Sequence, residues 1–129
     1  MATFVDTSGI LALLNRSDLR HGEAWVRWED LVSAGENLTT SSFVLAETYA
    51  LLQSRIGFDA VRTMHEELLP LIEVLWVESA TFAEAVTALL VADRRQLSLV
   101  DCVSFVLMRK LGLTRAFAWD KHFEEQGFR

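Results

Sequence analysis

Short apolar segments alternate with longer helical patterns along the whole chain, and this alternation constrains the fold more than any other feature. Four segments are typical of buried strands: 3–5, 38–40, 72–77 and 116–119. Apolar residues recur at helical spacing in the stretches 18–34, 41–57, 58–69, 79–94 and 98–112. Strands separated by helices of this length pair in parallel through crossover connections. We therefore predict an α/β fold, a three-layer α/β/α sandwich with a small parallel sheet.

The chain is predicted to form a single domain, residues 1–129. Pro70 is the only proline, and no linker, repeat or low-complexity tract divides the sequence. With 51% hydrophobic and 23% charged residues, disorder is excluded. The single cysteine, Cys102, excludes an intrachain disulfide and a cysteine-based zinc cage. The N-terminal apolar stretch lacks a preceding basic region and is interrupted by Asp6 and Thr7. We therefore expect a cytoplasmic protein without a signal peptide or membrane span.

The chain is acidic, with 18 Asp and Glu against 12 Lys and Arg and a net charge of −6. This balance disfavours a broad surface for non-specific binding of duplex DNA. Most of the acids lie in polar surroundings and are expected on solvated faces. Four others stand beside apolar segments and carry the functional argument: Asp6, Glu47, Asp101 and Asp120.

Two of these acids lie within helical patterns. At helical spacing, Glu47 has only apolar neighbours, at positions 43, 44, 50 and 51, so its carboxylate needs a cation or an ion pair with Arg16 or Arg55. Asp101 lies in a hydrophobic run, three residues after Ser98. That spacing also fits a helix capping box, so capping and ligand binding are both open for Asp101.

The other two acids follow predicted strands. Asp6 ends the strand at 3–5, and Asp120 follows the strand at 116–119. Each is compatible with a helix cap, but ligands of open α/β sheets bind at the carboxyl ends of the strands. Four carboxylates that met at this edge would repel one another unless a cation lay among them. Oxygen ligands favour Mg²⁺ or Mn²⁺ over zinc, and such a site is suited to phosphodiester hydrolysis.

At this point the sequence resembles the PIN-domain nucleases and, within them, the VapC-type toxins of bacterial toxin–antitoxin pairs. The matching segments, in family order, are FVDTSGILALLNRSDLRH, TTSSFVLAETYALLQSRIG, LSLVDCVSFVLMRKLGL and TRAFAWDKHFEEQGF. They span nearly the whole chain. The resemblance implies a small α/β/α sandwich and Mg²⁺-dependent cleavage of RNA phosphodiester bonds.

The resemblance also assigns roles to residues. Asp6 and Asp101 are the implied principal metal ligands, with Glu47 and Asp120 completing the acidic cluster; Glu47 as general base is an open alternative. Hydroxyls of Thr7 or Ser8 are expected to support the ligands or a bound water. Val100 departs from the family pattern, in which many relatives have Thr or Ser, so the expected hydroxyl there is that of Ser104, one turn away.

Further expectations concern partners. Two basic pairs are candidate contacts to RNA phosphates: Arg94 with Arg95, and Arg109 with Lys110. The apolar helices at 43–56 and 82–91 are expected to leave surface for a homodimer or an antitoxin. Two other functions stay open at this stage, namely a housekeeping RNA-processing nuclease and a catalytically inactive PIN-like binding module.

Overall fold

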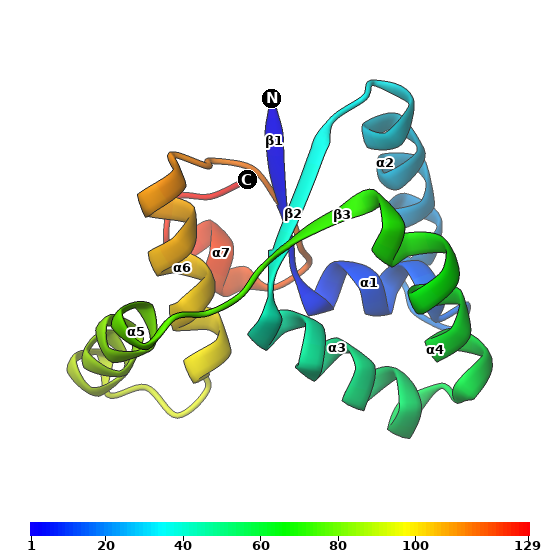
Figure 1. The fold of residues 1–129 in the computed structure, drawn as a ribbon. Helices are drawn as coiled ribbons and strands as arrows, with labels where there is room; N and C mark the ends of the chain where they lie inside the picture. Colours follow the sequence, from blue (N-terminus) through cyan, green and yellow to red (C-terminus); the bar gives the residue numbers. More distant parts are fainter.

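A four-stranded parallel sheet forms the centre of the molecule, and the computed structural model describes all 129 residues. The strands are β1 (Ala2–Val5), β2 (Asn37–Ser41), β3 (Ile72–Leu75) and β4 (Ala116–Phe117), in the order β3-β2-β1-β4 (Figure 1). In register, Thr3 lies opposite Leu38 and Phe4 opposite Ala116. The predicted parallel sheet is therefore confirmed, with β1 inside it.

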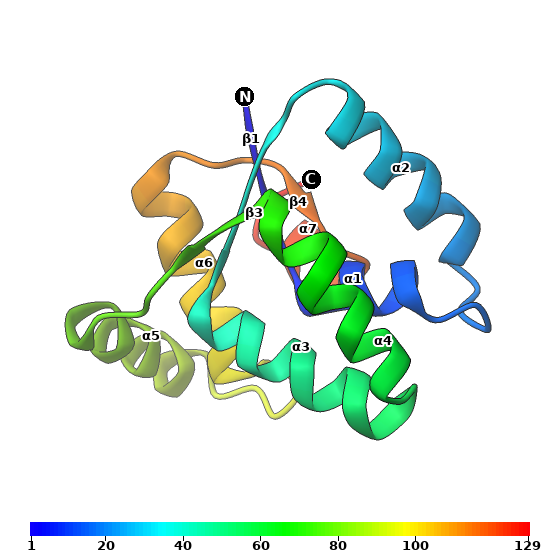
Figure 2. The same ribbon diagram turned by 45° about the vertical axis from the view of Figure 1, so that its right-hand side comes forward.

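Helices cover both faces of the sheet, as Figures 1 and 2 show. One layer contains α1 (Thr7–Leu14), α2 (His21–Ser33) and α4 (Phe58–Thr63), and the other contains α5 (Ser79–Ala92), α6 (Leu99–Leu111) and α7 (Lys121–Glu125). Neighbouring strand residues point to opposite faces. Accordingly, Val5 belongs to the core under the first layer and Phe4 to the core under the second. The predicted α/β/α sandwich is confirmed.

The helix α3 (Ser42–Arg55) follows β2 at the carboxyl edge of the sheet and reaches both layers. Ser41 caps it by accepting a hydrogen bond from the Val44 amide at 3.1 Å. Val44 packs into one core and Leu52 into the other. This position between the layers leaves only part of the helix surface buried.

Several predicted elements differ from the structure. The helix expected from residue 18 begins at His21, because Asp18 accepts the Arg20 amide at 2.7 Å in a preceding turn and Leu19 is fully exposed. The strand expected through residue 77 ends at Leu75 and lies at an edge of the sheet, and Trp76 is 75% exposed. The expectation of a buried strand that includes Trp76 was therefore wrong.

The helix expected over 58–69 is shorter and divided. After α4 the chain widens into the π-turn η1 (Met64–Leu68) and then tightens into the 3₁₀ turn η2 (Leu69–Leu71). Pro70 lies in that last turn, and it cannot continue an α-helix. The helix α7 was not predicted. No helix in the structure is both long and apolar enough to span a membrane.

A close contact between α1 and β4 sets the position of the carboxyl edge. A Cβ atom at Gly9 would lie 2.3 Å from the Phe117 carbonyl oxygen and 2.4 Å from its ring. Only glycine allows this approach. The approach places the turn after β1 directly beside the turn after β4, from which Asp6 and Asp120 emerge.

Candidate active site

Asp6 lies where β1 ends and α1 begins, and its side chain is almost completely buried. Its Oδ2 accepts hydrogen bonds from the Ser8 amide at 3.1 Å and the Ser8 hydroxyl at 2.6 Å. The Ser8 oxygen in turn accepts the Trp119 amide at 3.0 Å. Ser8 thus connects the first acid to the loop that carries Asp120.

Asp101 forms the predicted capping box at the start of α6. The Ser98 hydroxyl accepts the Asp101 amide at 3.0 Å, and Asp101 Oδ2 accepts the Ser98 amide at 3.2 Å. Asp120 caps α7 through Oδ1, which accepts the His122 amide at 2.9 Å. Each cap occupies one carboxylate oxygen, so capping leaves the other oxygen of both acids available to a ligand.

The three aspartates influence one another electrostatically. Burial raises the pKa of Asp6 to about 6; the hydrogen bonds from Ser8 oppose this rise, and the charges of Asp101 and Asp120 add to it. Burial also raises the pKa of Asp101; the bonds from Ser98 and the charge of His122 oppose this rise, and Asp120 adds to it. The charges of Asp101 and Asp120 therefore reach Asp6 at the carboxyl edge of the sheet.

Glu47 does not occupy the buried environment that its neighbours suggested. It is only partly buried, and Ala46 and Ala50 beside it are exposed, because α3 lies between the layers. It forms no ion pair with Arg16 or Arg55, and it is not among the groups that shift the pKa of Asp6. Both the buried apolar stripe and the ion pair were therefore wrong expectations, and a catalytic role of Glu47 stays a prediction.

The three hydroxyl residues expected to support the acids have different roles. Ser8 contacts Asp6 as described. Thr7 shares a hydrogen bond of 3.0 Å with Thr48 of α3, and Ser104 donates to the Val100 carbonyl at 3.1 Å in its own helix. Thr7 and Ser104 thus form hydrogen bonds with other partners, and neither forms one with an acid.

The basic residues predicted to bind RNA lie on the α5–α6–α7 side of the molecule. Arg94 forms an ion pair with Glu125 at 3.3 Å, and Lys110 forms one with Glu84 at 2.9 Å. Arg109 donates to the side chain of Gln126 at 2.5 Å and lies over the Phe128 ring. Arg95 is exposed and has no such contact. Their proposed contact with RNA stays a prediction.

The donors at the carboxyl edge fit a hard divalent cation. Asp6 and Asp101 are buried, and none of Asp6, Asp101 and Asp120 forms an ion pair with a basic side chain. Buried carboxylates without such partners are costly, and a cation would relieve this cost. No three acidic, His or Cys side chains are close enough to share one ion. A site for Mg²⁺ does not need three, because Mg²⁺ commonly takes one or two carboxylates and completes its shell with water and phosphate.

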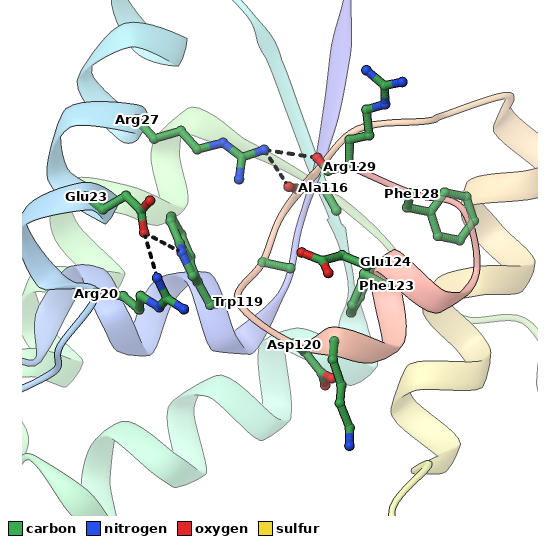
Figure 3. A pocket seen from close by; sticks show the side chains of 12 residues that line it. Arg20, Glu23, Arg27, Ala116, Trp119, Asp120, Phe123, Glu124, Phe128 and Arg129 are labelled. Carbon is green, nitrogen blue, oxygen red and sulfur yellow. Dashed lines mark hydrogen bonds and ion pairs between the residues drawn. The ribbon is translucent and has the colours of Figure 1, made fainter.

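Two residues beside this edge were not among the predicted site residues. His122 is 5% exposed, its charge acts on Asp101, and its Nδ1 lies 3.0 Å from Glu125 Oε1. Trp119 lies next to Asp120, and its indole N–H donates to Glu23 at 2.9 Å (Figure 3). His122 follows Asp120 by two residues in the sequence, and this spacing was a visible signal for it. The contact of Trp119 with α2 had no sequence signal.

Comparisons with known proteins agree with this geometry. The sequence model of the PIN domain family matches residues 3–129. The 23S rRNA-specific endonuclease VapC20 of Mycobacterium tuberculosis, in strains CDC 1551 and H37Rv, is 39% identical over 126 residues, or 97% of this chain and 94% of the relative.

Solved structures agree as well. The crystal structure of M. tuberculosis VapC20, described as a sarcin–ricin loop cleaving toxin, superposes with a TM-score of 0.85 at 37% identity, over 99% of this chain and 97% of that chain. FitAcB from Neisseria gonorrhoeae superposes with a TM-score of 0.68 at 14% identity, over 98% of this chain and 96% of that chain, which shows a shared fold.

Proposed function

This chain belongs to the PIN-domain family, and we propose that it is a metal-dependent endoribonuclease and the toxin of a type II toxin–antitoxin pair. One observation carries the proposal. Asp101 and Asp120, neither of them ion-paired, lie close enough to Asp6 for their charges to raise its pKa, at the carboxyl edge of a chain that aligns over 97% of its length with an endonuclease.

For the substrate, we propose the sarcin–ricin loop of 23S rRNA. The names of the M. tuberculosis relative state this specificity for that protein. The alignment covers nearly all of both chains, which supports the same specificity here. Because the proposed substrate is ribosomal, we expect the protein to act in the cytoplasm, where a cognate antitoxin would restrain it.

The proposed mechanism assigns Mg²⁺, or Mn²⁺, to Asp6 and Asp101, with Asp120 and Glu47 completing the site. The bound ion supplies Lewis-acid polarisation of the phosphate and lowers the pKa of a water molecule. The chain holds its ligands in place: Ser8 orients Asp6, and Ser98 orients Asp101. Glu47 is proposed either to join the ligands or to accept a proton from the attacking water.

The site assignment is tested by cleavage of a synthetic RNA hairpin with the sarcin–ricin sequence in Mg²⁺. Asp6→Asn and Asp101→Asn should each abolish cleavage, because an amide keeps the cap but loses the charge that holds the cation. Asp30→Asn is the matched control, since Asp30 is exposed on α2. Wild-type rates in both Asp6→Asn and Asp101→Asn would contradict the assignment.

The toxin role is tested by controlled expression. Induction of the wild-type chain should arrest growth and produce one dominant cut in 23S rRNA, and Asp6→Asn should relieve both effects. Normal growth despite RNA cleavage would instead favour a housekeeping nuclease. A chain that neither bound Mg²⁺ nor cut RNA would be the catalytically inactive binding module.

We also propose that a second copy of this chain covers the exposed apolar side chains at the carboxyl end of α5. Leu90 and Val91 are consecutive residues there and are 72% and 81% exposed. Adjoining apolar side chains left in solvent commonly mark an interface between proteins. Light scattering should therefore give a dimer that Leu90→Asp converts to monomers. A wild-type monomer at high concentration would remove this proposal.

A further inference from the structure

Two hollows lie along the outer edge of β4, beside the C-terminal segment that pairs with this edge, and together they are called the groove. The first, of about 410 Å³, begins at Asp120 and lies between α2 and the C-terminal segment (Figure 3). The second, of about 590 Å³, lies at the amino end of the strand. Arg27 and Arg129 line both hollows, so the two adjoin at these residues.

Backbone contacts hold the wall of this groove. The Arg129 amide donates to the Thr114 carbonyl at 2.9 Å, and the Ala116 amide donates to the Arg129 carbonyl at 3.1 Å. From α2, the Arg27 guanidinium donates to the carbonyls of Ala116 at 2.7 Å and Arg129 at 3.1 Å. It also lies 5.6 Å from the centre of the Trp119 ring. Arg27 is therefore a positioning residue that holds α2 against the C-terminal segment.

The second hollow is strongly basic although the whole chain is acidic. It is lined by Arg27, Arg115 and Arg129 and by no acidic residue. Burial lowers the pKa of Arg27; the charge of Arg115 lowers it further, and Glu23 opposes this. Only Arg115 has a carboxylate partner, Glu36 at 3.4 Å.

The first hollow contains both signs of charge, and part of the acidic charge is already compensated. Glu23 lies 3.5 Å from Arg20 and accepts the indole N–H of Trp119. Lys121 is exposed beside Asp120. Glu124 also lines this hollow. The first hollow therefore carries both signs of charge in near balance, whereas the charged side chains of the second are all positive.

We propose that this groove binds the RNA strand on one side of the cleaved bond, with Arg115 contacting a phosphate away from the acidic site. The inference rests on the proposed function, which it deepens by giving the substrate a path. Residues 115–120 span about 17 Å in extended form. Because phosphates of one strand follow at about 3.4 Å along a helix axis, more than one phosphate fits along this length.

The experiment measures binding of the wild-type chain in EDTA to a fluorescein-labelled hairpin with the sarcin–ricin sequence, over a series of KCl concentrations. Arg115→Gln should weaken binding about five- to tenfold at low salt and reduce the salt slope by a little under one, as expected for one lost phosphate contact. Glu36→Gln is the matched control, because it removes the same ion pair but keeps the cation. Arg62→Gln, on α4, should change nothing.

Trimmed RNAs locate the contact. Shortening the hairpin stem on one side of the cleaved bond should weaken RNA binding by the wild-type chain as much as Arg115→Gln does. The same shortening should not weaken RNA binding by the variant any further. Binding and a salt slope equal to those of Arg62→Gln would overturn the proposal. So would a polyglutamate peptide whose binding, unlike that of RNA, depends on Arg115, since the groove would then serve a protein.

The RNA groove and the nuclease activity can be refuted separately. If the wild-type chain cuts RNA and Arg115→Gln binds and cuts equally well, the groove is wrong and the nuclease stands. If the wild-type chain cuts no RNA and Arg115→Gln still weakens RNA binding, the proposed nuclease is wrong and the RNA groove stands.

Discussion

Asp6→Asn should stabilise the metal-free protein at neutral pH while it abolishes activity. The pKa of Asp6 is raised from 3.8 to about 6, mainly by burial. A raised pKa means that the protonated carboxyl favours folding below pH 3.8, and that this contribution is lost as the pH rises through 6. A difference of about two pH units corresponds to about 3 kcal/mol at pH 7.5 and to about half of that at pH 5. An amide avoids the cost and still accepts the hydrogen bond from Ser8.

The assay is urea unfolding in EDTA at pH 5 and pH 7.5, extrapolated to water. The free energy of unfolding of Asp6→Asn should exceed that of the wild-type chain by about 3 kcal/mol at pH 7.5, and this gap should narrow at pH 5. Added Mg²⁺ should stabilise the wild-type chain at pH 7.5 and leave the variant unchanged, because only the carboxylate binds the ion. Asp30→Asn should follow the wild-type chain throughout. Parallel pH profiles of wild type and Asp6→Asn would refute the reasoning.

Three other predictions concern the framework of the site, and each is measured by urea unfolding. Gly9→Ala should destabilise by about 3 kcal/mol or more, because its Cβ would collide with Phe117, whereas Gly22→Ala, with open space around it, should be neutral or slightly stabilising; equal effects would contradict the close contact. Ser98→Ala should cost about 1 kcal/mol through the lost cap of α6, and an unchanged stability would show that the cap contributes nothing. Leu52→Ala should cost about 2–5 kcal/mol because this side chain is fully buried, and a loss below 1 kcal/mol would mean that the core closes over the cavity.

The sheet and the order of its layers followed from the sequence because periodicity is a local property. Short apolar runs and helical patterns at period 3.6 can be recognised within one segment, and crossover connections make the strands parallel. The predictions failed where contacts between distant segments determine which side chains are buried. Trp76 continues an apolar run, but β3 ends at an edge of the sheet, so nothing covers this side chain.

At the candidate site, the sequence by itself determined that Asp6 and Asp120 follow strands and that Asp101 lies at a helix start, because caps and strand ends are local features. Only the tertiary structure decided which acids act on one another. It brought Asp101 and Asp120 toward Asp6 and left Glu47 partly exposed between two layers.

The groove beside β4 was decided entirely by the tertiary structure. Arg27 and Arg115 are far apart in the sequence and lie on different elements, so neither residue's local pattern indicates the other. They become neighbours only because α2 packs against the strand that follows Arg115, where the Arg27 guanidinium reaches the Ala116 carbonyl. Local chemistry thus determined the secondary structure and the candidate acids, and long-range packing decided which charges share a surface.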